Sequence, residues 1–315
     1  MVTGGAGFIG SHLAARLVQD GQTVRVFDSL TSAASQKRAA VLASLPGVEV
    51  VQGDIRDTKL CRSVLTDADF VFHHAAEVSV PRSVEDPAAC VEVNLGGTVN
   101  LLEAARFAGT VQRFVLASSC AVYGDTPGTE KSEASAVDPL SPYAISKLAG
   151  EYLCRNYFRL HGVQTVCLRY FNVYGPDQDP NGAYAAVIPK FIAAILQSKK
   201  PTVYGDGGQS RDFVFVSDIA EANLRAAAAG PDALGRAFNI GSGRSVSLTE
   251  ILRQLGQITG QTIERDTQPA RLGDIRDSRS DSREATNLLE FSPKVTLEDG
   301  LARTLHWYQS ELTQV

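Results

Sequence analysis

Gly4-Gly-Ala-Gly7-Phe-Ile-Gly10 opens a chain of 315 residues and runs directly into a helical pattern at Ser11. Glycines at this spacing allow a tight turn, and they let backbone N–H groups approach a pyrophosphate at the positive end of a helix. Glycine-rich turns also occur simply to connect a strand to a helix, so this loop needs support from elsewhere in the chain. The candidate cofactor-binding residues in it are Gly4, Gly7, Phe8, Ile9 and Gly10.

Asp28 supplies that support. It stands eighteen residues after the last glycine of the loop, where the next strand is expected to end. A carboxylate at that place can bind the hydroxyls of an adenosine ribose. Its neighbours Ser29 and Leu30 carry no positive charge for a 2′-phosphate, so NAD is favoured over NADP. Asp54 and Ile55 follow the next expected strand and would lie near the adenine, although an ordinary loop aspartate explains Asp54 equally well.

Short apolar runs alternate with helical stretches through the first half of the chain. This alternation is typical of buried parallel strands joined by crossover helices, and it predicts an α/β fold with a doubly wound, Rossmann-type parallel sheet. The expected strands are residues 23–27, 48–51, 70–72, 113–117 and 165–169, and the expected helices are residues 10–19, 90–108 and 143–161.

The second half of the chain differs in composition and in the length of its expected helices. Beyond residue 174 the chain becomes rich in Pro and Gly, with shorter helices expected at 187–197, 218–229 and 248–260. This pattern predicts a smaller C-terminal α/β lobe over the carboxyl edge of the sheet, where ligands of such folds bind. We expect an NAD-binding domain at 1–174 and a substrate-binding lobe at 175–315, interleaved so that some later segments return to the first domain.

Composition excludes several classes of function. A net charge of −5 gives no reason to expect a nucleic acid or an anionic membrane as a partner. No apolar run approaches the ~18 residues of a spanning helix. The five cysteines show no CxxC spacing and no matching His pair, which argues against a disulfide framework or a zinc site. We therefore expect a cytoplasmic protein with reduced thiols and no bound metal.

Tyr143 and Lys147 stand four residues apart in Ser141-Pro-Tyr-Ala-Ile-Ser-Lys147. In a helix they share one face, where the ammonium favours phenolate and so predicts a tyrosine of near-neutral pKa that transfers protons. An isolated pair of this spacing also occurs on solvated helix surfaces. Ser119 ends an expected strand, where a serine can serve merely as an N-cap. The catalytic interpretation is favoured because strand end, glycine loop and helix meet at one crevice of a doubly wound sheet.

Taken together, these residues resemble the extended short-chain dehydrogenase/reductase family. The likeness to its nucleotide-sugar 4-epimerases extends over nearly the whole chain, to the UDP-N-acetylglucosamine 4-epimerases above all and also to the UDP-glucose 4-epimerases. It is carried by Ser79-Val-Pro-Arg-Ser83, Ser141-Pro-Tyr-Ala144, Leu168-Arg-Tyr-Phe-Asn-Val-Tyr-Gly175, Gln178-Asp-Pro-Asn-Gly-Ala-Tyr-Ala-Ala-Val-Ile-Pro189 and Gly205-Asp-Gly-Gly-Gln-Ser-Arg-Asp212.

The resemblance implies a reaction. Tyr143 would take the proton from the sugar 4-hydroxyl, while Lys147 and the nicotinamide cation hold its pKa down and Ser119 hydrogen-bonds the same oxygen. Hydride would pass to a tightly bound NAD and return to the opposite face of the 4-keto sugar. The cofactor then ends as it began, so the implied function is reversible C4 epimerisation of a UDP-hexose.

The resemblance also assigns binding residues. NAD would be lined further by Ala75, Ala76, Asn94, Tyr143, Lys147, Tyr170 and Val173. The diphosphate and ribose of UDP would face Asn172, Arg211, Arg271 and Asp274, and uracil would lie against Ala186, Val187, Val203 and Tyr204. Ser79, Ser119, Cys120, Tyr143 and Ser278 would complete the substrate site.

Ser278 bears on substrate size. It aligns with the family position that closes the sugar pocket, where a tyrosine restricts enzymes to glucose and galactose substrates. A serine leaves room for an N-acetyl group, so UDP-GlcNAc and UDP-GalNAc are expected alongside UDP-Glc and UDP-Gal. Three departures from the family pattern bear on sugar preference: Cys120 replaces a frequent serine, Val78 a glycine, and Glu77 adds a carboxylate.

Other activities of the family are less well supported. The dehydratases need an acidic pair after the active-site hydroxyl and the decarboxylases a glutamate before Val-Tyr-Gly, and Cys120-Ala121 supplies neither. UDP-glucuronate 4-epimerase and other nucleotide-sugar oxidoreductases remain open. From another class, a non-catalytic NAD-binding regulator or scaffold is the alternative. By analogy with the family we expect a homodimer built through helices 90–108 and 143–161.

Overall fold

Seven parallel strands form the centre of the larger lobe in the computed structural model, which describes residues 1–180, 186–270 and 276–313. In spatial order the strands are β11 (Arg236–Ile240), β7 (Thr165–Tyr170), β5 (Arg113–Ser119), β4 (Phe70–His73), β1 (Val2–Thr3), β2 (Val24–Asp28) and β3 (Val48–Gln52). The order reverses between β1 and β4. Such a switch point opens the crevice in which doubly wound sheets bind ligands.

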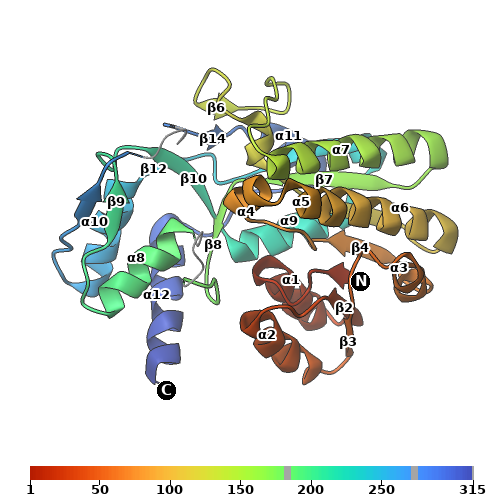
Figure 1. Ribbon diagram of the computed structural model, residues 1–315, viewed down its shortest axis with the longest axis horizontal. Coiled ribbons are helices and arrows are strands. Elements are labelled where there is room, and N and C mark those ends of the chain that lie inside the picture. The colour runs from red at the N-terminus through yellow and green to blue at the C-terminus, as the bar shows by residue number, and fades with distance from the viewer. Residues whose placement is uncertain (181–185, 271–275, 314–315) are drawn as a thin grey trace.

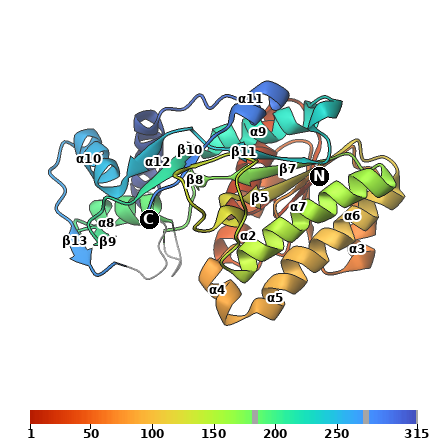
Figure 2. The ribbon, with the colours of Figure 1, turned by 90° about the horizontal axis from the view of Figure 1, so that it is seen from above.

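Helices cover both faces of this sheet (Figures 1 and 2). One face carries α1 (Phe8–Gln19), α2 (Ala33–Ala43), α9 (Val216–Ala228) and α11 (Arg283–Leu289). The other carries α3 (Thr58–Leu65), α6 (Gly97–Ala108) and α7 (Pro142–His161). The predicted doubly wound α/β fold is confirmed.

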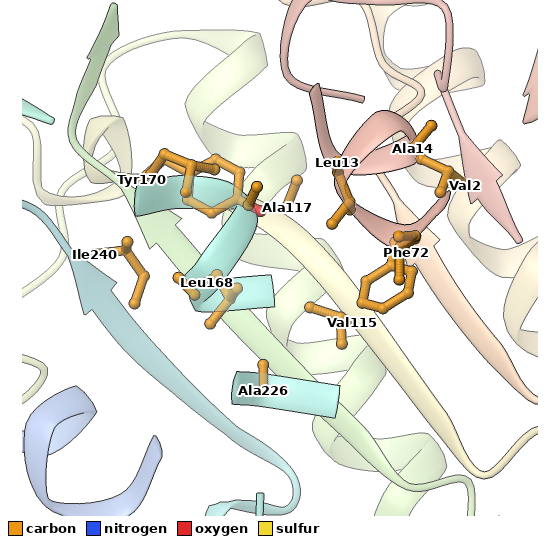
Figure 3. Close-up of a cluster of buried hydrophobic side chains, with 14 of the residues drawn as sticks. Val2, Leu13, Ala14, Phe72, Val115, Ala117, Leu168, Tyr170, Ala226 and Ile240 are labelled. Carbon is orange, nitrogen blue, oxygen red and sulfur yellow. The ribbon is translucent and has the colours of Figure 1, made fainter. Parts of the chain in front are cut away.

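Successive side chains of β5 show how one strand contributes to the hydrophobic cores on both faces of the sheet. Val115 belongs to the core under α1 and α9, whereas Phe114 and Leu116 belong to the core under α3, α6 and α7. Successive side chains of a strand point to opposite faces, so a strand buried on both sides is apolar throughout. Figure 3 shows part of the first core, with Leu13 of α1 and Ala226 of α9 on the side of the sheet that carries Val115.

The smaller lobe has its own core. Its strands are β8 (Asn172–Tyr174), β10 (Ser210–Phe215) and β12 (Ser245–Ser247), with β9 (Thr202–Tyr204) paired to β13 (Asp266–Gln268). They pack with α8 (Val187–Leu196), α10 (Leu248–Thr259) and α12 (Leu297–Thr313). β6 (Glu130–Lys131) pairs with β14 (Arg279–Ser280), and 3-10 turns lie at Cys120–Tyr123 and Pro231–Ala233. Three later elements, α9, β11 and α11, belong to the larger lobe.

The prediction of a single helix over residues 90–108 is wrong in one respect, because the structure divides this range. α4 (Val80–Glu85) and α5 (Pro87–Val91) precede a π-helical turn at Glu92–Gly96, and α6 starts only at Gly97. A Cβ at Gly97 would lie 2.3 Å from the Ile55 side chain, so the helix approaches the loop after β3 very closely there. π-turns inside helices are frequent at functional sites, and this one carries Asn94.

Candidate active site

The glycine loop joins β1 to α1 through backbone geometry that side chains would obstruct. Gly4 has φ +60°, and a Cβ there would come 2.6 Å from the Ala75 nitrogen. A Cβ at Gly10 would come 2.2 Å from the Gly4 carbonyl oxygen. The Asp28 carboxylate accepts hydrogen bonds from the Ala6 nitrogen at 3.1 Å and the Leu30 nitrogen at 2.9 Å, which ties the end of β2 to the loop. These residues fit a dinucleotide, because they leave backbone N–H groups and a helix N-terminus open to a pyrophosphate.

A cavity of about 1790 Å³ extends from the glycine loop to the smaller lobe. Most of the residues predicted for the cofactor and the substrate line it. They are Gly4, Gly7, Phe8, Ile9, Gly10, Asp28, Ser29, Asp54, Ile55, Ala75, Ala76, Ser119, Tyr143, Lys147, Tyr170, Asn172, Val173, Ala186, Val187, Tyr204 and Arg211.

Five predicted residues lie outside the cavity wall: Ser79, Asn94, Cys120, Val203 and Ser278. Val203 is fully buried in the core of the smaller lobe, so its side chain supports the wall from behind. Ser278 lies beside β10, where its nitrogen donates to the Ser210 carbonyl oxygen at 3.2 Å. Arg271 and Asp274 lie outside the described residues.

Asn94 is buried and acts on the loop that leads into α4. Its Oδ1 accepts from the Glu77 nitrogen at 2.7 Å, and its Nδ2 donates to the Glu77 carbonyl oxygen and to Ser146 Oγ, both at 3.0 Å. Ser79 caps α4 by accepting from the Arg82 nitrogen at 3.2 Å. Both residues therefore position the segment around Glu77, which lines the cavity.

α7 brings Tyr143 and Lys147 to the cavity. Ser141 caps the helix by accepting from the Ala144 nitrogen at 3.1 Å, and Pro142 occupies the first turn, where its missing N–H is not needed. Lys147 Nζ donates to the Ala117 carbonyl oxygen at 2.8 Å and lies 5.8 Å from the centre of the Tyr143 ring. Ser119, at the end of β5, shares a hydrogen bond with the Tyr143 side chain. It also caps the 3-10 turn by accepting from Ala121 N at 3.1 Å, as the N-cap interpretation predicts.

The groups of the protein alone do not give Tyr143 the near-neutral pKa that its spacing from Lys147 predicts. Burial raises the pKa of Tyr143 to about 12, and the hydrogen bond with Ser119 opposes this only in part. Burial also lowers the pKa of Lys147 to about 8. Desolvation disfavours both charged forms, and this outweighs the attraction inferred from the spacing of the two residues. The protein alone thus keeps the phenol protonated.

Two histidines at the end of β4 are held in the neutral form. His73 contacts Thr3 Oγ1 at 2.7 Å and Thr98 Oγ1 at 2.9 Å, and burial lowers its pKa. His74 contacts the Tyr170 hydroxyl at 3.0 Å, and burial lowers its pKa to about 4. In the described ranges, no group of three or more His, Cys, Asp or Glu side chains is placed to hold a metal ion. The histidines therefore order the wall of the cavity.

The substrate side of the cavity is built on β8 and β10. Asn172 Nδ2 donates to the Asp212 carbonyl oxygen at 3.1 Å, and Arg211 Nη1 donates to the Ser210 carbonyl oxygen at 2.9 Å. Cys120, the residue after Ser119, is half-buried, and burial raises the pKa of its thiol to about 12, so it is a weak hydrogen-bond donor and no nucleophile.

Sequence reasoning missed several residues of the wall, among them Arg38, Gln178 and Lys190. Arg38 lies on α2, a helix that the apolar pattern did not predict. A signal was present, because Ser32 and Ser35 form a capping box at its start. Gln178 begins the segment matched to the family and Lys190 directly follows it, but the sequence predicted no role for either residue.

Comparison with known proteins decides the family. Residues 1–241 match the NAD dependent epimerase/dehydratase family. The chain belongs to this family. UDP-glucose 4-epimerase of Mycolicibacterium smegmatis is 39% identical over 99% of this chain and 98% of its own length. The motif-based resemblance is therefore confirmed.

Solved structures of the epimerase/dehydratase family agree with this assignment. UDP-N-acetylglucosamine 4-epimerase from Methanobrevibacter ruminantium, in complex with UDP-N-acetylmuramic acid, has a TM-score of 0.92 at 35% identity and covers 98% of this chain and 97% of its own. UDP-glucuronic acid 4-epimerase from Bacillus cereus, in complex with UDP-glucuronic acid and NAD, has a TM-score of 0.90 at 32% identity, with 98% of both chains covered.

The family membership establishes an NAD-dependent enzyme of the nucleotide-sugar 4-epimerase/dehydratase type. NAD is the cofactor, as predicted. Within the described parts of the chain, no helix combines the length and the apolar character needed to cross a membrane.

Proposed function

We propose that this enzyme catalyses the reversible C4 epimerisation of UDP-hexoses, with UDP-GlcNAc and UDP-GalNAc as the principal pair and UDP-Glc and UDP-Gal as further substrates. The observation that carries the proposal is the meeting of Ser119, Tyr143 and Lys147 at the cavity that also contains the glycine loop. These three groups provide a hydrogen bond, a proton donor and acceptor, and a cation, which is the set needed to move a hydroxyl proton during hydride transfer.

We infer a role for each group from its place in the cavity and from the family resemblance. Bound NAD supplies the hydride acceptor and then the hydride donor. Tyr143 exchanges the proton of the sugar 4-hydroxyl, and Ser119 orients both the phenol and that hydroxyl. Lys147, held by the Ala117 carbonyl oxygen, places positive charge beside the phenol. Since the protein alone keeps the pKa of Tyr143 near 12, the positive charge of oxidised nicotinamide is what would activate the phenol when the cofactor is ready to accept hydride.

A neutral sugar is supported over a uronate. Arg82 is a cation of the cavity wall, but its Nη1 pairs with the Glu77 carboxylate at 3.3 Å. A sugar carboxylate near this pair would meet Glu77 as well as Arg82. The pair therefore disfavours a uronate. UDP-glucuronate 4-epimerisation is the second candidate, because an enzyme of that activity is 32% identical to this chain. The acetylated sugars are proposed on the family resemblance, which puts the small Ser278 at the position that closes the sugar pocket; in the structure Ser278 lies beside β10, outside the cavity wall.

The direct test is NMR of product mixtures after separate incubation with UDP-Glc, UDP-Gal, UDP-GlcNAc, UDP-GalNAc and UDP-glucuronate. We expect interconversion within both neutral pairs, faster for the acetylated pair, and none for the uronate. Interconversion of the uronate alone would replace the proposal by the second candidate. If no sugar is interconverted, the epimerase assignment is wrong.

We also propose a homodimer formed through the helical face of α4, α6 and α7. Large apolar side chains are exposed on these helices, including Val84, Phe107, Ile145, Tyr152 and Leu160. Ile145 is 52% exposed and Leu160 73% exposed. Several large apolar side chains exposed on neighbouring helices are the kind of surface that protein interfaces cover. A second copy of the same helical face would cover it, and α7 would then carry both catalytic residues and the interface.

A further inference from the structure

Arg38 of α2 forms an ion pair with Asp177, which follows β8 in the chain. Arg38 Nε lies 2.7 Å from Asp177 Oδ2, and Nη2 lies 3.3 Å from Oδ1. Nη2 also donates to the Asp177 carbonyl oxygen, and Nη1 donates to the Ala6 carbonyl oxygen at 3.4 Å. The Arg38 side chain is only 10% exposed and the Asp177 side chain 34%. One guanidinium thus binds the glycine loop and the loop after β8 at the same time.

This pair connects the larger lobe to the segment that leads into the smaller lobe, beside the cofactor cavity. α2 belongs to the larger lobe, whereas β8 leads into the smaller lobe (Figure 1). The residue after Asp177, Gln178, is held from the smaller lobe, because its carbonyl oxygen accepts from the Tyr308 hydroxyl of α12. Arg38 and Gln178 both line the cavity together with Gly7 and Phe8. The ion pair therefore joins the glycine loop to the loop after β8 at the edge of the cavity, with Arg38 in the cavity wall.

The backbone at Asp177 indicates that its carboxylate is needed. Asp177 has φ +62°, in the left-handed region that favours glycine. Asp and Asn tolerate this region better than other side chains do. Glycine would suit the backbone, but it could not pair with Arg38.

We propose that the Arg38–Asp177 pair is a latch that retains NAD in the enzyme. The pyrophosphate of a dinucleotide lies at the helix N-terminus after a glycine loop, which here is the start of α1. Release of NAD would require the bridge beside it to open, so the stability of the ion pair adds to the barrier for dissociation. The proposal rests on NAD as the cofactor and does not depend on which sugar is epimerised. It gives an epimerase the means to keep a cofactor that is regenerated within each turnover.

The test measures the release of NAD from the purified holoenzyme, by exchange against radiolabelled NAD and rapid gel filtration. Asp177→Asn removes the charge while keeping a residue that accepts positive φ, and Arg38→Met keeps the apolar stem. We expect each variant to release NAD about three to ten times faster than wild type, as loss of a partly buried ion pair allows. The double variant should be no faster than the quicker single variant, because both changes break one interaction.

Lys37→Ala is the matched control. Lys37 also lies on α2 and also pairs with the smaller lobe, through Glu311 of α12, but its side chain is 67% exposed and does not line the cavity. We expect its NAD release to stay within twofold of wild type.

Three results would overturn the latch. Unchanged release in both single variants would do so directly. Faster release in Arg38→Met with unchanged or slower release in Asp177→Asn would show that Arg38 binds the pyrophosphate itself. Equal acceleration by Lys37→Ala would show a general effect of lobe contacts. Urea midpoints of the cofactor-free variants identify any loss of folding, and the NAD readout stands even if the sugar assignment fails.

Discussion

Lys147 Nζ lies 5.8 Å from the centre of the Tyr143 ring, and its hydrogen bond goes to the Ala117 carbonyl oxygen. The cation is thus anchored to the end of β5 and placed beside the phenol at the same time. Ser119 comes from that same strand end and reaches the Tyr143 side chain. One strand end and one helix turn therefore hold all three groups, and the predictions below test what each contributes.

Tyr143→Phe should lower kcat about 10³-fold, because it removes the group that exchanges the hydroxyl proton. The measurement is the initial rate of UDP-GlcNAc conversion, followed by chromatography of the nucleotide sugars. Tyr152→Phe is the matched control, since Tyr152 lies on the same helix but is exposed. Its rate should equal that of wild type. A Tyr143→Phe enzyme as fast as wild type would instead favour a protein whose NAD serves regulation or scaffolding.

Lys147→Met should make the cofactor-free protein more stable at pH 7 while abolishing activity. Burial lowers the pKa of Lys147 from 10.5 to about 8, so the folded state resists the charged form. Below pH 8 this penalty is present in full, and removing the charge gains about 2 kcal/mol after the lost hydrogen bond to Ala117 is subtracted.

The sign of the pH dependence follows from proton binding. Between about pH 8 and pH 10.5 the unfolded chain keeps a proton that the folded chain has released, so wild-type stability rises with pH in this window. The advantage of Lys147→Met should therefore shrink from pH 7 to pH 10. Urea unfolding at the two pH values measures it, and an equal difference at both would contradict the assigned pKa.

The sequence predicted the parts of this fold that depend on local patterns. β2, β3, β4, β5 and β7 begin within one residue of the expected positions, because buried parallel strands are continuous apolar runs bounded by turns. The expectations at 113–117 and 165–169 are shorter than the strands themselves, since a polar strand end looks like a loop in sequence. Ser118, Ser119 and Tyr170 extend those strands into the cavity.

Other features depend on contacts between distant residues and carry no local signal. The π-turn precedes the close approach of Gly97 to Ile55, and β11 pairs with β7 alone in the large sheet. Burial raises the pKa of Tyr143 in the protein without NAD, and the sequence gives no sign of this, because the spacing of two side chains reveals their attraction but not their desolvation. The Arg38–Asp177 pair joins residues 139 positions apart, beyond the reach of any periodic pattern.

Glu151 is placed one turn after Lys147 on α7, and it holds the helix against the sheet. Its two oxygens accept from Arg169 Nε at 2.9 Å and Nη2 at 2.7 Å, and Oε1 also accepts from Ser118 Oγ. Glu151→Gln should destabilise the protein by about 3 kcal/mol in urea unfolding, because it leaves the buried Arg169 charge without its counter-ion.

Asp20→Asn is the control for this pair, since it breaks an exposed ion pair with Arg16 and should cost less than about 0.5 kcal/mol. A similar loss of stability in both variants would show that burial gives the Glu151–Arg169 pair no special weight. Replacing both members, as Glu151→Leu with Arg169→Leu, should restore part of the lost stability, because no unpaired charge is then left inside.

Ile145→Glu should convert the proposed dimer into a monomer. Ile145 is exposed on α7 between the inward-facing Ala144 and Ser146, so a charge there is tolerated by the isolated chain but not by an apolar interface. Size-exclusion chromatography with light scattering gives the mass, 33.7 kDa for one chain. Gln257→Glu on α10 is the control, because it adds a negative charge to an exposed position of the smaller lobe. Dimers that persist in Ile145→Glu would place the interface elsewhere, and a wild-type protein that is already monomeric would refute the dimer itself.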